Sequence, residues 1–136
     1  QDSQHILAVG GGGLVLRWNG EQWKQFAAGT DYDLYGVTGS SLNQIFLCGL
    51  AGTLIAFEDN TWRKNFTGVR SDLHAVAGVG EKCFTVGSNG TILGNVNGDW
   101  IQEKSGTTST LHTAINTESH IYAAGSNGVL LARKLA

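Results

Sequence analysis

Short runs of apolar and β-branched residues, separated by turn-forming residues, follow one another along the whole chain. The segment from 34 to 67 contains four of these runs, and the cluster Glu58-Asp59-Asn60 separates the last two. Runs of this length bounded by turn residues predict β-strands. A sustained apolar stripe with a 3.6-residue period would indicate an amphipathic helix, and the sequence has none. The pattern therefore predicts an all-β protein, with strands in this segment at 34–39, 44–49, 53–57 and 62–66.

The runs recur at a constant spacing. A pattern of small or apolar–Gly–x–x–Gly–x–apolar–apolar occurs four times, and the spacings between its first glycines are 39, 38 and 38 residues. These glycines are Gly10, Gly49, Gly87 and Gly125. The same spacing separates Trp23, Trp62 and Trp100, and it also separates Leu34, Leu73 and Leu111. A period of about 38 residues indicates stacked supersecondary units.

The period divides a single domain, residues 1–136, into four units. We place them at 4–33, 34–72, 73–110 and 111–136. The two middle units each hold four predicted strands. The first unit starts at the second strand of the pattern and the last stops after the third, so both are partial.

The glycines of the repeat have structural roles. Asn89-Gly90 and Asn127-Gly128 predict type I′ hairpin turns, because both central residues of that turn need a positive φ. We expect the first glycine of each copy to leave room where two backbones approach closely.

Composition narrows the classes of protein. The chain of 136 residues is 41% hydrophobic and 15% charged, which is typical of a folded domain. Its net charge of −2 provides no basic field for nucleic acid or an anionic membrane, and no apolar run is long enough for a membrane helix. Cys48 and Cys83 occupy repeat positions of opposite parity, so we expect two free, buried thiols on opposite faces of equivalent strands.

The unit resembles a known repeat. Gly-x-x-Gly-Thr-Ile-Leu in the middle of a four-stranded unit of about 38 residues, with Trp opening the last strand, resembles the repeats of the photosystem II assembly/stability factor (Ycf48-like) family. Those repeats are related to the Asp-box repeats of bacterial sialidases. The resemblance implies a β-propeller of four-stranded blades, here with incomplete first and last blades. The Asp-box itself and the arginine cluster of sialidases are absent from this sequence.

Two closures of the propeller stay open at this stage. One chain could form a small four-bladed ring, or two chains could meet head to tail in a ring of about eight blades. A chain that is part of a longer protein is a third alternative. Unpaired strand edges invite pairing, so we expect residues 4–9 and 129–133 to lie at or near a seam between blades.

Two sets of side chains are candidates for ligand binding. Tyr35, His74 and His112 share one repeat position on the first strand of a unit, which lines the channel of a propeller. Trp23, Trp62 and Trp100 share a position on the last strand, where indoles could stack on sugars. No catalytic set, metal site or cofactor motif recurs at consistent positions.

The sequence thus predicts a non-enzymatic binding or scaffold propeller that contacts a protein or ligand through its loops and channel mouth. A glycan-binding, lectin-like propeller is the main alternative, and a degenerate sialidase-like hydrolase is another. We expect no cofactor, no nucleic acid partner and no membrane span, and we consider a homodimer or higher assembly. The compartment is open, with an extracytoplasmic or secreted location somewhat preferred.

Overall fold

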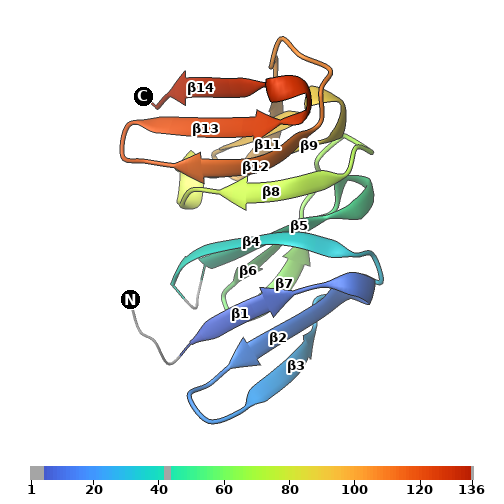
Figure 1. Ribbon diagram of the computed structural model, residues 1–136. Coiled ribbons are helices and arrows are strands. Elements are labelled where there is room, and N and C mark those ends of the chain that lie inside the picture. Colours follow the sequence, from blue (N-terminus) through green and yellow to red (C-terminus); the bar gives the residue numbers. More distant parts are fainter. Residues whose placement is uncertain (1–4, 42–43, 136) are drawn as a thin grey trace.

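The computed structural model describes residues 5–41 and 44–135, so Gln4, where the first predicted unit and the first seam segment begin, lies outside the described residues. The described chain forms four antiparallel sheets that follow one another from the N-terminal to the C-terminal end (Figure 1). This confirms the all-β prediction. Within the described residues, no helix is long and apolar enough to span a membrane.

Each sheet contains three or four consecutive strands of the chain, as the repeat predicts. The first sheet holds β1 (Ile6–Val9), β2 (Leu14–Trp18) and β3 (Trp23–Ala27). The second holds β4 (Leu34–Ser41), β5 (Gln44–Gly49), β6 (Leu54–Glu58) and β7 (Thr61–Lys64). The third holds β8 (Leu73–Ala77), β9 (Phe84–Gly87), β10 (Ile92–Val96) and β11 (Asp99–Glu103). The fourth holds β12 (Leu111–Asn116), β13 (His120–Gly125) and β14 (Leu130–Lys134).

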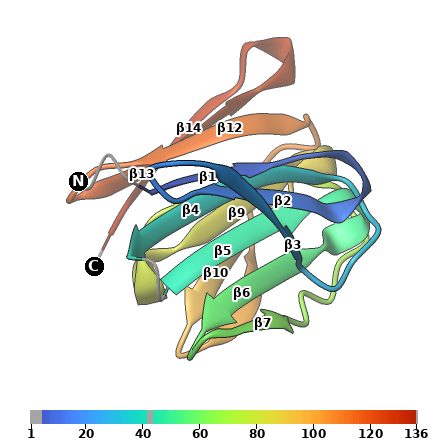
Figure 2. The ribbon, with the colours of Figure 1, turned by 90° about the horizontal axis from the view of Figure 1, so that it is seen from below.

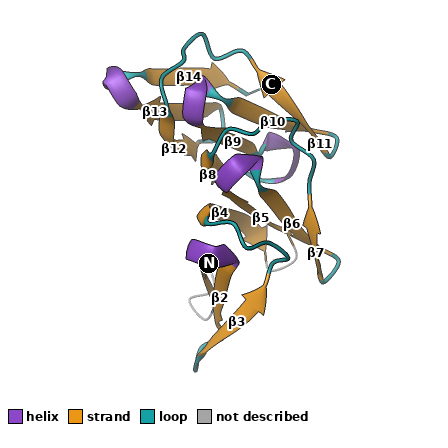
Figure 3. Cartoon of the chain, turned by 90° about the vertical axis from the view of Figure 1, so that its right-hand side faces the viewer, coloured by secondary structure: helices purple, strands orange, loops and turns teal. Residues whose placement is uncertain are grey.

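In each sheet a short helical turn joins two neighbouring strands, at the same position of the repeat, and Figure 3 shows these turns as separate purple segments. They are η1 (Gly11–Gly13), η2 (Leu50–Gly52), η4 (Ser88–Gly90) and η5 (Ser126–Gly128), while η3 (Gly80–Lys82) lies between β8 and β9. In η4, Asn89 and Gly90 have φ values of 58° and 67°, and the Thr91 N–H donates to the Ser88 carbonyl at 3.2 Å. This geometry confirms the predicted type I′ turn.

The first glycine of the repeat is required by a close approach of two backbones. A Cβ added at Gly49, Gly87 or Gly125 would overlap the carbonyl oxygen of the residue before the innermost strand of the same sheet. Gly10 has no such backbone against it, because the first sheet has no equivalent of β4. The predicted role therefore holds for three of the four copies.

The hydrophobic core lies between successive sheets. One cluster joins the first and second sheets around Val15, Leu47 and Ile55, and a second joins the second and third sheets around Phe46 and Leu93. A third cluster joins the third and fourth sheets around Leu111. Side chains alternate along a strand, so each middle sheet contributes one face to the sheet before it and the other face to the sheet after it.

The two cysteines lie in the same inter-sheet cluster. Cys48 lies on the face of the second sheet that packs against the third, and Cys83 lies on the facing side of the third sheet. The two cysteines thus lie on opposite faces of equivalent sheets, as predicted, and these two faces pack against each other. Both thiols are free and buried, as predicted. Removal from water raises the pKa of both thiols from 9.0 to about 12, and the neighbouring Cys48 adds to the effect at Cys83.

The first and fourth sheets lie at opposite ends of an open arc (Figures 1 and 2), so a four-bladed ring closed within the chain is not what the structure shows. Their outward faces carry exposed apolar side chains, namely Ile6 and Trp23 at one end and Ile115 and Leu130 at the other. The described parts of the two predicted seam segments, 5–9 and 129–133, therefore belong to different ends of the arc.

One turn of the repeat is strained by its sequence. Ala51 occupies the position of Asn89 and Asn127 and has a φ of 55°. Because the left-handed region costs alanine about 1 kcal/mol more than asparagine, we expect Ala51→Asn to raise the free energy of unfolding by about that amount. Urea denaturation measures it, and Asn89→Ala is the matched reverse change. An unchanged or lower stability of Ala51→Asn would contradict this reading.

The buried thiols make the free energy of unfolding depend on pH in the alkaline range. The folded state holds the thiol protons more tightly than the unfolded chain, so their contribution is complete below pH 9 and is lost as pH rises toward about 12. We expect the free energy of unfolding to fall less steeply above pH 9 in Cys48→Ala than in the wild type.

In native protein near neutral pH, neither thiol should react with a disulfide reagent, because both are buried. Labelling of a thiol before the protein unfolds would show the burial to be wrong.

Candidate functional site

Three candidate ligand-binding residues lie at equivalent β-bulges on the innermost strands. The pairing of β4 with β5 shifts register between Leu34 and Gly36, which leaves Tyr35 as the extra residue. The same shift occurs around His74 in β8 and around His112 in β12. A bulge redirects the side chain of its extra residue, and bulges are common next to functional sites.

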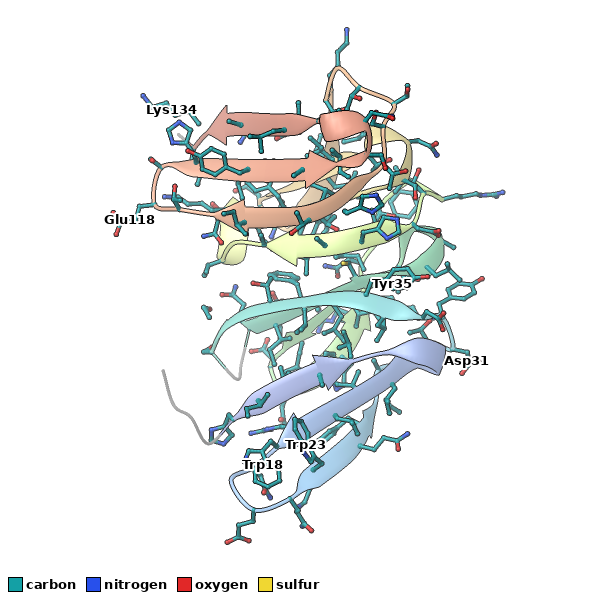
Figure 4. The ribbon with its side chains drawn as sticks, viewed as in Figure 1. Trp18, Trp23, Asp31, Tyr35, Glu118 and Lys134 are labelled. Atoms are coloured by element: carbon teal, nitrogen blue, oxygen red, sulfur yellow. The ribbon has the colours of Figure 1, made fainter. Side chains whose placement is uncertain are left out.

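The bulges bring the three rings into one row across three sheets. The ring centroids of Tyr35 and His74 are 5.5 Å apart with nearly parallel planes, and those of His74 and His112 are 5.7 Å apart with the planes tilted by 47°. Figure 4 shows Tyr35 at the end of the sheets away from Glu118. We call the row formed by Tyr35, His74 and His112 the bulge surface.

Each imidazole of the bulge surface is held by a serine of its own sheet. His74 Nε2 is 3.1 Å from Ser88 Oγ, and His112 Nε2 is 3.0 Å from Ser126 Oγ. These serines begin η4 and η5, so the turns position the rings. The second sheet has Leu50 at that place, and the Tyr35 ring is 44% exposed. The serine contacts fix one nitrogen of each imidazole, and the stacking of neighbouring rings orders the row.

Aspartates tie the second and third sheets to the turn of the sheet before. Asp33 Oδ1 accepts a hydrogen bond from the Gly12 N–H at 2.8 Å, and Asp72 Oδ1 accepts one from the Ala51 N–H at 2.9 Å. Their backbone carbonyls accept from the turn of their own sheet, as in the bond from Ser88 N to Asp72 O. These bonds link the first three sheets in succession, directly beside the bulge surface.

The three tryptophans proposed as a sugar platform do not form one. Trp100 is 6% exposed and packs edge-on against Phe46 of the second sheet, with centroids 5.5 Å apart. Trp62 packs with Phe57 against the cluster between the first and second sheets. Trp23 is 47% exposed beside Trp18 at the N-terminal end of the arc (Figure 4), and it is the most exposed of the three.

A surface hollow lies at residues that the sequence analysis did not single out. It has a volume of about 400 Å³ beside the turn η2, and its lining includes Tyr32, Lys64, Phe66 and Arg70. Phe66 is 90% exposed. No repeat marker points to it, because Lys104 occupies the Phe66 position in the next unit.

The described residues contain no group of three or more His, Cys, Asp and Glu side chains placed to hold a metal ion. The chemistry available at the bulge surface is therefore aromatic stacking together with hydrogen bonding by imidazole, phenol and serine groups. An arrangement of this kind suits recognition of an extended ligand that passes along the row.

Comparison with known proteins supports the fold. No family model matches the chain, and no curated protein matches its sequence. Among solved structures, it is similar to YCF48 bound to D1 peptide, at 14% identity over 99% of this chain, with a TM-score of 0.71. It is also similar to YCF48 from Cyanidioschyzon merolae, at 20% identity over 97% of this chain, with a TM-score of 0.73.

The likeness extends along nearly the whole chain and confirms the resemblance to the YCF48 β-propeller fold. The chain spans about half the length of those structures, 51% of one and 50% of the other.

Proposed function

We propose that this chain is a non-enzymatic binding module that recognises an extended segment of a protein partner on the bulge surface. The observation that carries the proposal is the row of three rings on three equivalent bulges. The row of three rings is an elongated contact surface, which an extended polypeptide covers more fully than a compact ligand does. Flat aromatic groups with hydrogen-bonding edges are enriched where proteins bind one another.

The structural likeness favours a peptide as the class of ligand. One of the similar YCF48 structures contains a bound D1 peptide. The glycan-binding alternative rests on Trp23, since Trp62 and Trp100 pack within the molecule. We assign no catalytic step to the chain.

We also propose that a second copy can continue the propeller. Phe46 and Tyr122 occupy the same repeat position two units apart, and Phe46 receives Trp100 from the following sheet. In a head-to-tail pair, Trp23 of one copy takes the place of Trp100 and packs on Tyr122 of the other. Burying the exposed apolar side chains of both ends, at about 25 cal/mol per Å², supplies the driving force.

Selection from a library of random linear peptides displayed on phage tests the bulge surface. We expect peptides selected by the wild type to lose affinity roughly fivefold on His74→Ala and on Tyr35→Ala, because each change removes a stacking partner worth about 1 kcal/mol. Biolayer interferometry measures the loss. The control is Glu118→Ala, an exposed change in the hairpin at the other end of the fourth sheet (Figure 4). Selected peptides that bind both variants as tightly as the wild type would refute the proposal.

Sedimentation equilibrium at micromolar concentration tests the head-to-tail contact. We expect the wild type to associate and Trp23→Lys to be monomeric, because a lysine cannot be buried against Tyr122 without a partner for its charge. Ile101→Lys is the matched control, since Ile101 is also an exposed apolar residue but lies on the third sheet, away from either end. A monomeric wild type, or a Trp23→Lys variant that still associates, would remove this part of the proposal.

A further inference from the structure

The hollow beside η2 has a backbone frame that the next unit repeats. The segment that follows β7 crosses the turn, and Thr67 Oγ1 in this segment donates to the Gly52 carbonyl at 2.9 Å. The carbonyl oxygen of Val69 lies where a Cβ at Gly52 would be, and the carbonyl oxygen of Thr107 lies in the same place at Gly90 of η4. A hollow of about 590 Å³ lies beside η4 as well. The fold therefore produces a hollow at this place of the repeat, whichever side chains line it.

The side chains that line the η2 hollow are not repeated. Lys64, Phe66 and Arg70 belong to its lining. The equivalent residues 38 positions later are Gln102, Lys104 and Thr108. The equivalent residues 39 positions earlier are Gln25, Ala27 and Asp31. Neither neighbouring unit combines an aromatic ring with two cations at these positions, so the fold itself does not require this combination.

The charged side chains of the η2 hollow are all positive. Lys64 and Arg70 are both exposed, and neither forms an ion pair with any residue that the structure describes. The nearby carboxylates of Asp31, Asp33 and Asp72 are not part of the lining. Two of them, Asp33 and Asp72, already accept hydrogen bonds from backbone N–H groups of the turns. The lining thus offers two positive charges to a negatively charged ligand.

Two exposed aromatic rings accompany the cations. Phe66 is 90% exposed and Tyr32 is 52% exposed, and both line the hollow. A Cβ added at Gly68 would lie 3.7 Å from the Phe66 ring, so the ring lies beside a residue that has no side chain to cover it. Small-molecule sites enclose most of their ligand, which a wall as exposed as Phe66 does not do. A protein segment, in contrast, can cover both the hollow and the ring, and aromatic and arginine side chains are enriched in such contacts.

We propose that the η2 hollow binds an acidic segment of a partner protein. An aspartate or glutamate of the segment contacts Lys64 and Arg70, whose guanidinium donates two parallel hydrogen bonds to the carboxylate. A neighbouring apolar side chain of the segment packs on Phe66 and Tyr32. All lining residues lie between Thr30 and Arg70, so neither end of the chain contributes to the site. None of them belongs to the bulge surface, so this docking surface is separate from it.

Competitive selection from a phage library of random linear peptides tests the proposal. The wild type is the immobilised target, and an excess of the soluble Lys64→Gln/Arg70→Thr double variant removes peptides that bind elsewhere. This variant carries the residues of the third unit at the same positions, so it should fold like the wild type. We expect the selected peptides to share an acidic residue beside an apolar one, and to bind the double variant about tenfold more weakly because two contacts to the carboxylate are lost. Selected peptides without an acidic residue, or no peptide that distinguishes the two proteins, would overturn the proposal.

Single variants locate the selected peptides. Phe66→Ala introduces the residue that the first unit has at this position, Ala27, and should weaken binding about fivefold, because an aromatic contact is lost. The matched control is Lys82→Gln, which removes an exposed cation in η3, at the other end of the third sheet. It should leave the affinity unchanged. Biolayer interferometry measures each affinity. Undiminished binding by Phe66→Ala, or an equal loss on Lys82→Gln and on the double variant, would contradict the assignment.

The remaining arms separate this site from the bulge surface and from other occupants. The selected peptides should keep their affinity on Tyr35→Ala and His74→Ala, whatever the bulge surface binds, and a loss on these variants would refute a separate site. Phenyl phosphate serves as the small-molecule probe. If it competes with the selected peptides at an affinity equal to theirs, the occupant is a small anion and the proposal fails. Vesicles of phosphatidylserine and phosphatidylcholine that bind the wild type but not the double variant would overturn it in favour of a lipid surface.

Discussion

Burial of apolar sheet faces against one another is the interaction on which the structure depends. None of the four sheets has a core of its own, and the buried clusters are assembled from two sheets at a time. A sheet that gives both faces to its neighbours can use apolar residues along entire strands, as β5 does from Ile45 to Cys48. Stability is then largely a sum of contacts between neighbours, as in other repeat architectures.

The polar contacts near the turns fix how neighbouring sheets are placed. The hydrophobic effect is non-directional, whereas the hydrogen bond from Ala51 N to Asp72 Oδ1 is directional. The fourth sheet lacks the aspartate, since Thr110 stands in its place. Its turn η5 is held by the hydrogen bond from Asn127 Nδ2 to Ser109 Oγ, in the segment that leads into β12. The row of rings on the bulge surface depends on this placement, because its members come from three different sheets.

Much of the fold could be predicted because its strands and turns have local sequence signals that recur with a constant period. The runs at 34–39 and 121–124, and the Asn89-Gly90 turn, each signal their structure within a few residues. The bulges could not be predicted, because Leu34-Tyr35-Gly36 reads as an ordinary strand and the extra residue arises from its pairing with β5. The alignment of Tyr35, His74 and His112 was predicted from their shared position, but their stacking depends on that bulge.

The different burial of the three tryptophans could not be predicted for a related reason. Trp23, Trp62 and Trp100 share one repeat position, yet Trp100 is buried, Trp62 is half-buried and Trp23, which has no preceding sheet within the described residues, is exposed. The meeting of Cys48 with Cys83 likewise depends on which faces of two sheets oppose each other. Such features depend on how neighbouring units pack, so they cannot be predicted from the repeat period alone.

The second glycine of the repeat has a consequence for how such a protein can grow. At Gly13, Gly52 and Gly90 the carbonyl of the chain entering the next sheet lies where a Cβ would be, whereas Gly128 has open space around it. The fourth turn thus already has the shape that a following unit requires. Duplication of a 38-residue segment could lengthen the arc without altering any residue at the junction, so the number of units is a quantity that evolution can change in single steps.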